Sequence, residues 1–178
     1  ETKGSTTTVA ASTTASELLM SVEKNIVLKG DALSKPTFTL TSNSKSHLRM
    51  ANQGSSKAII NAEAPKNKID FLDTVAKSST INGDSGNEIV RIMDSSRLTG
   101  KSRFNLGANQ DKVIVDGIIN NLIIDNGDDN QKDVTKIPSA DQIIKKIKIN
   151  NFGEEDRLKH EGTVFKYGDI ANDNALNE

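Results

Sequence analysis

Several residue types that build wide hydrophobic cores are scarce in this chain of 178 residues. It contains no cysteine and no tryptophan, one tyrosine and five phenylalanines. The lack of cysteine excludes disulfide bridges, thiolate metal sites and a cysteine nucleophile. Hydrophobic residues make up 34% of the chain, well below the share in an average globular domain. This composition does not suit a wide aromatic core, but it suits a narrow column of Ile, Val and Leu.

An excess of charge of either sign is also lacking. The 23 Lys and Arg residues nearly balance the 24 Asp and Glu residues, and the two signs are interspersed. The sequence therefore shows no basic field for a phosphate backbone, and nucleic acid is not an expected partner. No apolar run approaches the ~18 residues of a membrane-spanning helix, so membrane insertion is not expected. The chain begins at Glu1 rather than at a methionine, so we expect either a processed product or a trimmed chain.

What the sequence does contain is a repeat of apolar residues. A first column recurs every 20 to 25 residues and consists of Leu40, Ile60, Ile81, Phe104, Ile124 and Ile149. A second column recurs every 21 to 24 residues and consists of Leu48, Ile69, Val90, Val113, Val134 and Leu158. A third, less regular column consists of Val75, Leu98, Ile118, Ile143 and Val164. Members of the second column lie in short runs with an apolar residue at every second position, the pattern of a half-buried strand.

Three short apolar runs in each repeat of about 22 residues indicate a coil with three faces. We therefore expect an all-β fold, a single-stranded parallel β-solenoid of about six coils of 20–25 residues with three short strands each. Equivalent residues would then stack one coil apart. The alternative is an antiparallel β-sandwich or jelly roll, since short strands separated by turns suit that fold equally well. A sandwich, however, predicts no fixed period.

A polar residue follows each member of the first apolar column. These residues are Thr41, Asn61, Asn82, Asn105, Asp125 and Asn150. In a solenoid they would stack, and stacked amide side chains hydrogen-bond to one another along the axis. The spacing therefore predicts a structural ladder that consists of Asn61, Asn82, Asn105, Asp125 and Asn150.

The repeat divides the chain into four segments. Residues 1–15 are rich in Ser and Thr and predict an extended arm, either solvated or added as a strand to a neighbouring subunit. Residues 16–30 predict a short amphipathic helix over 16–24, with Ser16 as its N-cap, that caps the first coil and leads into the first strand. Residues 31–170 form the expected solenoid, and residues 171–178 form a polar tail.

Carboxylates cluster where the coil is expected to turn. In Gly83-Asp-Ser-Gly86-Asn-Glu88-Ile-Val90, two glycines, an acid and an apolar residue keep the spacing of the pattern Gly-Gly-x-Gly-x-Asp-x-apolar-x. Gly107, Asp111 and Val113 keep part of it, and Asp156 and Leu158 match its last two defined positions. These turns resemble degenerate hemolysin-type (RTX) calcium-binding repeats. That family is a parallel β-roll with calcium held between adjacent turns, although its coil is shorter than the one expected here.

The RTX resemblance implies a calcium site made of acids at the turns. The candidate ligands are Asp84, Glu88, Asp111, Asp128 and Asp156. Calcium takes six to eight oxygen ligands, some of which consecutive coils would supply. The turn between Asp125 and Asp133 is out of phase with the pattern, because Val134 directly follows Asp133. If calcium is not bound, these acids are solvated turn residues, and no other cofactor is expected.

No catalytic residue is expected. The sequence lacks the Gly-x-Ser-x-Gly of serine hydrolases, and the Gly-Lys-Ser at 100–102 lacks the upstream glycine of a phosphate-binding loop. Asp70, Asp94 and Asp116 are spaced so that they would align near successive coils. They leave a polysaccharide-active β-helix enzyme as a less favoured alternative.

These observations favour a non-catalytic structural or assembly protein. Solenoids of this kind resemble parts of phage particles and bacterial surface proteins, a likeness of fold alone. We expect a component of a virion (capsid decoration, fibre or spike) or of an extracellular surface assembly. Its expected partners are copies of itself or a larger particle, bound through the solenoid faces and the N-terminal arm. The alternative is a calcium-dependent, RTX-like secreted or adhesive module.

Overall fold

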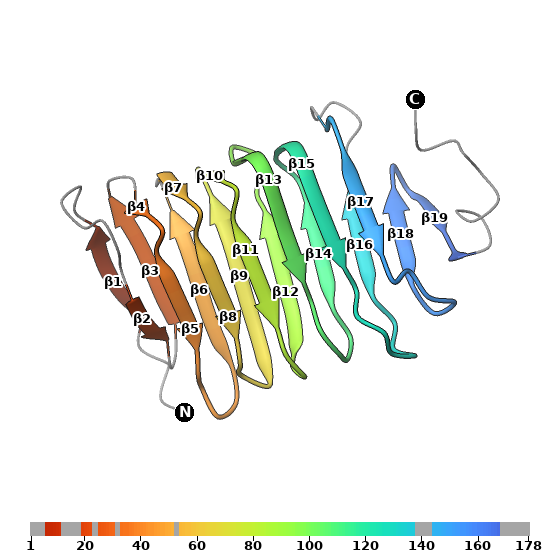
Figure 1. Cartoon of the computed structure of the whole chain (residues 1–178), viewed down its shortest axis with the longest axis horizontal. Coiled ribbons are helices and arrows are strands. Elements are labelled where there is room, and N and C mark those ends of the chain that lie inside the picture. The colour runs from red at the N-terminus through yellow and green to blue at the C-terminus, as the bar shows by residue number, and fades with distance from the viewer. Residues whose placement is uncertain are drawn as a thin grey trace.

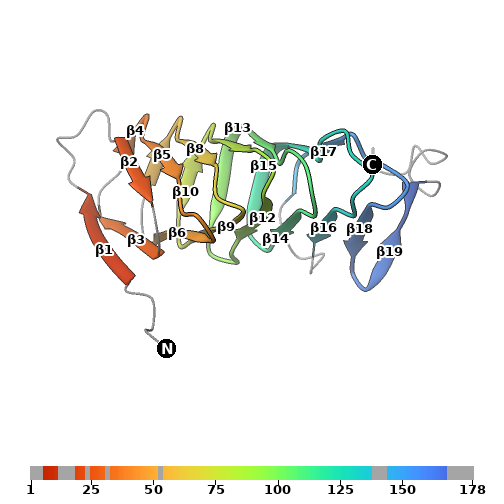
Figure 2. The same cartoon turned by 90° about the horizontal axis from the view of Figure 1, so that it is seen from below.

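The polypeptide winds into two long layers of parallel strands (Figures 1 and 2). The computed structural model describes residues 6–11, 19–22, 25–30, 33–51, 54–137 and 144–167. The first sheet contains, in spatial order, β1 (Thr6–Ala11), β3 (Asn25–Gly30), β6 (Ser46–Ala51), β9 (Lys66–Leu72), β12 (Asn87–Ile92), β14 (Lys112–Val115), β16 (Val134–Ile137), β18 (Arg157–His160) and β19 (Thr163–Phe165).

The second sheet consists of two files of strands that meet in one long strand, β13 (Arg97–Asn105). One file contains β2 (Leu19–Val22), β5 (Thr37–Leu40), β8 (Ile59–Ala62) and β11 (Thr80–Gly83). The other contains β4 (Leu33–Ser34), β7 (Gly54–Ser56) and β10 (Val75–Lys77). Beyond β13 the sheet continues with β15 (Ile118–Asp125) and β17 (Ile147–Asn150). Among the described residues, no helix is long and apolar enough to cross a membrane.

One lap of the chain shows how the coil is built. β8, β9 and β10 form three successive sides, and β11 then lies beside β8 with Ile81 opposite Ile60. β12 lies beside β9 in the same way, with Val90 opposite Ile69. Among the described strands only β18 and β19 pair antiparallel. The chain is therefore a parallel β-solenoid of about six turns, as the period predicted, and the antiparallel sandwich is excluded.

The first apolar column is confirmed over most of its length. Four of its members are fully buried and lie opposite one another in successive coils: Ile60, Ile81, Phe104 and Ile124. Ile149 continues the column opposite Ile124. The prediction for the earlier coil is wrong, because Phe38 lies opposite Ile60 and Leu40 lies opposite Ala62. Thr39, not Thr41, therefore precedes Asn61 in the polar ladder.

The second apolar column is confirmed except at one coil. Leu48, Ile69, Val90 and Val113 lie opposite one another in β6, β9, β12 and β14. In β16 the next position is held by Thr135, which is buried between Val113 and Leu158. Val134 was predicted there because it is more apolar, but it lies one residue out of register and is partly exposed.

The third apolar column is confirmed at Leu98, but Val75 and Ile118 each lie one residue from the buried position. Val75 is 49% exposed, and the buried file on this side is formed by Ser55, Ala76, Leu98 and Ile119. Because this side of the coil is short and partly filled by Ser and Ala, hydrophobicity alone does not reveal its inward positions. Ile118 is partly exposed, Val164 lies on the antiparallel strand β19, and Ile143 is outside the described residues.

The N-terminal segments also differ from expectation. Leu19–Val22, within the segment predicted as a capping helix, forms strand β2, which pairs with β5 and extends the second sheet by one strand. The helix is therefore not formed at these residues; residues 16–18 and 23–24 lie outside the described part. Thr6–Ala11 of the predicted arm forms β1, which pairs with β3 of the same chain. The predicted tail, 171–178, is also outside the described part.

Replacing Phe104 by Ala is expected to lower the free energy of unfolding by about 3–5 kcal/mol. The Phe104 side chain is fully buried and its ring stacks on Phe71 at 6.5 Å, so its removal leaves a cavity in the centre of the column. Chemical denaturation monitored by circular dichroism measures the change. Phe165→Ala, on the partly exposed strand β19, is the matched control and should cost much less. Equal losses for the two variants would contradict the stacked core.

Candidate functional site

A file of acidic side chains runs inside the solenoid near the start of four successive strands of the first sheet, β12, β14, β16 and β18. Its members each stand two residues before a position of the second column: Glu88, Asp111, Asp133 and Asp156. We call these four residues the acid file. All of them are at most 3% exposed. Asn67 and Ser46 hold the equivalent positions in the two preceding coils and are also buried.

Three carboxylates of the file bind the backbone of the preceding coil, and that of Glu88 accepts from Nδ2 of Asn67 in the preceding coil at 2.9 Å. The backbone N–H of Glu88 donates to Oδ1 of Asp111 at 2.7 Å. The N–H of Asp111 donates to Oδ1 of Asp133 at 2.7 Å, and that of Asp133 to Oδ1 of Asp156 at 2.8 Å. Because buried N–H groups must be paired, these side chains complete the backbone hydrogen bonding at the turns. The acid file therefore joins successive coils.

The carboxylate oxygens that accept no backbone N–H bear on the protonation of the acid file. Burial, together with the negative charges of Glu88 and Asp133, raises the pKa of Asp111 to about 9, although the hydrogen bond from the Glu88 backbone acts in the opposite direction. Burial likewise raises the pKa of Asp133 to about 7. Oδ2 of Asp111 and Oε2 of Glu88 are buried without a donor as long as both groups are carboxylates. A proton on Asp111 supplies that donor, so Asp111 is a neutral acid at pH 7.

The structure brings together only part of the predicted calcium site. Glu88, Asp111 and Asp156 belong to one file, but Asp84 and Asp128 are exposed at the turns outside it. Asp133, which was predicted to be out of phase, is the missing member; its apolar partner position is Thr135. Its phase was missed because the pattern demanded an apolar residue where a buried threonine stands.

The carboxylate oxygens of the acid file are used mainly as hydrogen-bond acceptors, so the file is a hydrogen-bonded ladder. One oxygen of Asp111, Asp133 and Asp156 accepts a backbone N–H, and Oδ2 of Asp156 accepts from Nδ2 of Asn126 at 2.8 Å. Within the described residues, no three His, Asp or Glu side chains are grouped so as to hold a metal ion. Calcium binding stays a prediction.

The predicted polar ladder is confirmed in its register. Asn61, Asn82, Asn105, Asp125 and Asn150 lie opposite one another on the outer face of the second sheet. Nδ2 of Asn82 donates to Oδ1 of Asn61 at 3.0 Å, and Nδ2 of Asn105 donates to Oδ1 of Asn82 at 3.0 Å. The amides therefore connect three consecutive coils from outside, as the acid file connects coils from inside.

The three aspartates considered for polysaccharide chemistry do not align. Asp70 lies in β9 opposite Arg91, whereas Asp94 and Asp116 lie in the turns after β12 and β14. Asp70 is buried on the outer face of the first sheet, with Oδ2 2.8 Å from Nε2 of His47 and 3.2 Å from Nζ of Lys68. Burial raises the pKa of Asp70, but the hydrogen bond from His47 and the charge of Lys68 outweigh it, so the net pKa is lowered. This geometry forms an ion-pair cluster and no paired-carboxylate site.

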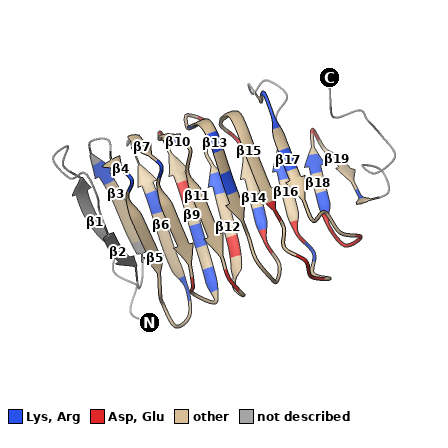
Figure 3. Ribbon diagram, in the orientation of Figure 1, with Lys and Arg blue, Asp and Glu red and all other residues tan. Residues whose placement is uncertain are grey.

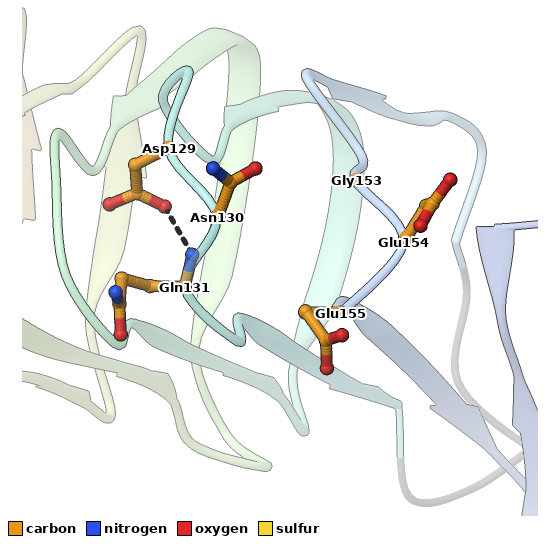
Figure 4. A pocket seen from close by; sticks show the side chains of 6 residues that line it. All are labelled: Asp129, Asn130, Gln131, Gly153, Glu154 and Glu155. Carbon is orange, nitrogen blue, oxygen red and sulfur yellow. Dashed lines mark hydrogen bonds between the residues drawn. The ribbon is translucent and has the colours of Figure 1, made fainter.

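A hollow of about 340 Å³ lies between two turns near the C-terminal end of the rod (Figure 4). Its lining consists of Asp129, Asn130, Gln131, Gly153, Glu154 and Glu155. Asp129 is tied down, because its Oδ1 accepts the N–H of Gln131 at 2.9 Å and its Oδ2 that of Asn109 at 2.6 Å. Glu154 and Glu155 are exposed at the rim. Three carboxylates and no cation line this hollow.

No family model matches the chain, and neither the search of curated proteins nor that of solved structures found a match.

The pH dependence of stability tests the protonation of the acid file. The folded chain holds a proton on Asp111 up to a pKa of about 9, whereas an unfolded aspartate loses it near 3.8, so this group's contribution to stability falls as pH rises from about 4 to 9. We expect the melting temperature to fall over this range and Asp111→Asn, whose amide oxygen keeps the bond to Glu88 N–H, to reduce the fall. Asp128→Asn, at an exposed turn, is the control. Identical pH slopes for wild type and Asp111→Asn would refute the assignment.

Proposed function

We propose that this chain is a non-catalytic structural module, a rigid rod that docks by its sides within a virion or an extracellular surface assembly. In a virion it would serve as capsid decoration, fibre or spike. The observation that carries the proposal is the continuous stacking of the coils. Backbone pairing, a filled aliphatic core and two side-chain ladders all run along the same axis.

The ends of the rod support docking by the sides. At the C-terminal end, the hairpin of β18 and β19 turns the first sheet antiparallel, and β17 ends the second sheet with three exposed lysines nearby: Lys145, Lys146 and Lys148. Charged residues on an edge strand oppose pairing with another sheet. The described part of the N-terminal arm, β1, pairs with β3 of its own chain and is the end strand of the first sheet. End-to-end pairing is therefore disfavoured at the C-terminal end, and we propose that the long faces bind the partner.

Location in the source organism tests this proposal directly. An antibody raised against the chain is applied to purified particles, to the cell surface and to the cytosolic fraction of the producing cells. We expect the antigen in particles or in the extracellular fraction, and immunogold electron microscopy should place it on their outer surface. Antigen confined to the cytosol would refute the structural assignment.

A calcium-dependent, RTX-like module is the second candidate, because Oε2 of Glu88 and Oδ2 of Asp111 are buried in the acid file without a donor from another group. Under the proposed structural function, the melting temperature at pH 8 should be the same in EDTA and in millimolar calcium, since backbone N–H groups already use one oxygen of most file members. A calcium-dependent rise that Asp111→Asn abolishes and Asp94→Asn retains would instead favour the RTX-like candidate.

A further inference from the structure

The outer face of the first sheet is strongly basic, although the chain as a whole is nearly neutral. Its strands carry nine cations on outward positions: Lys29, Arg49, Lys66, Lys68, Arg91, Lys112, Lys136, Arg157 and Lys159. We call this surface the basic face. The one carboxylate on the described outward strand positions is Asp70, which is buried and contacts His47, Lys68 and Arg49. The exposed charge of the basic face is therefore almost entirely positive.

The cations of one file on the basic face are regularly spaced. One file across the strands reads Lys68, Ile89, Lys112, Val134 and Arg157, so that a cation alternates with an aliphatic residue. Neighbouring strands lie about 4.8 Å apart, which places the cations of this file roughly 10 Å from each other. A partner of the basic face should therefore carry anionic groups that repeat with every coil, about 4.8 Å apart, or with every second coil, about 10 Å apart.

The turns beside this sheet provide such anionic groups. The exposed or half-exposed acids where the chain passes from the second sheet to the first include Asp84, Asp125 at the end of β15, Asp128, Asp129, Glu154 and Glu155. One of these acids follows β11, three lie at the end of β15 or in the turn after it, and two follow β17, whereas the turn after β13 carries no exposed acid. Figure 3 shows acids in these turns, as well as elsewhere on the rod, and Lys and Arg on the strands. We call these six acids the acidic ridge. The hollow between its last two turns is bordered by three carboxylates and suits a lysine side chain.

We propose that the basic face of one copy binds the acidic ridge of a second copy, so that rods associate side by side. This inference rests on the proposed structural function and names its partner. Two rods have the same coil spacing, so the acids at the consecutive turns after β15 and β17 match cations that lie on neighbouring or alternate strands of the basic face. Because the basic face and the acidic ridge are different surfaces, the contact is heterologous and leaves one of each free, which allows open arrays to grow.

Other polyanions fit the basic face less well. Its outward strand positions carry no Trp, Tyr or Phe among the described residues, so bases of single-stranded nucleic acid find no stacking platform. The acidic ridge borders the basic face along the C-terminal half of the rod and repels any polymer that is anionic throughout. A second copy instead presents its acids on the acidic ridge and its cations on a different surface, the basic face.

Sedimentation velocity of the full chain, with two reversed-charge variants, tests the contact. Wild type is expected to self-associate at tens of micromolar in 50 mM salt and to dissociate in 500 mM salt, since salt screens exposed pairs. Lys112→Glu/Lys136→Glu reverses the basic face and Glu154→Lys/Glu155→Lys reverses the acidic ridge. Each variant alone should associate at least about tenfold more weakly. A mixture of the two should recover association, because the first keeps an intact ridge and the second an intact face.

The control is Lys77→Glu/Lys101→Glu, which changes two exposed lysines of the second sheet and should associate like wild type. Circular dichroism confirms that all variants are folded. A monomeric wild type in low salt, a control as weak as the two test variants, or a mixture that does not associate would overturn the inference. Monomeric wild type that binds heparin would overturn it in favour of a polyanionic partner. None of these results changes the particle location expected above, so failure of the contact and failure of the structural function are distinguishable.

Discussion

Parallel pairing one coil apart is the constraint on which the rest of this structure depends. Each residue lies opposite its counterpart in the next coil, so the side chain at one position lies directly against the side chains at the same position in the two neighbouring coils. Aliphatic and amide residues benefit from this repetition, because Ile packs on Ile and Asn82 hydrogen-bonds to both Asn61 and Asn105. Carboxylates do not, because like charges about 4.8 Å apart repel.

The acid file and the acidic ridge reduce this repulsion in different ways. Inside, the acid file uses backbone N–H donors and a raised pKa at Asp111 and Asp133, so that its members are not all charged at neutral pH. Outside, the ridge acids are solvated at protruding turns. The same residue type therefore has a structural role at buried turn positions and an electrostatic role at exposed ones. An exposed acid such as Asp128 and a buried one such as Asp133 lie only five residues apart.

The sequence predicted the features that repeat with the coil period, but it missed inward positions that are held by small or polar residues. The spacing of Ile60, Ile81 and Phe104 predicted both the coil and the Asn ladder, because these residues recur on long, apolar sides. The third side failed at Val75, since Ala76 is small enough to face inward and carries little hydrophobic signal. Asp133 was set aside for the same reason, because Thr135 occupies an aliphatic position. The strand at Leu19–Val22 was missed because its apolar residues also fit a helix, and pairing with β5 decides between the two.

The composition gave no sign that cations and acids lie on different surfaces of the folded chain. Interspersed Lys and Asp in the sequence suggested an ordinary solvated surface, but strand alternation sends every second residue to one face and the turns to an edge. Positions such as Lys68, Lys112 and Arg157 thereby meet on the basic face, while Glu154 and Glu155 gather at the turns. The aliphatic residues between these cations keep them about two strand spacings apart, near the screening length of 0.1 M salt. Repulsion within this file of cations is therefore small, although Lys136 and Lys159 lie directly opposite each other, and an acidic surface is attracted to the face as a whole.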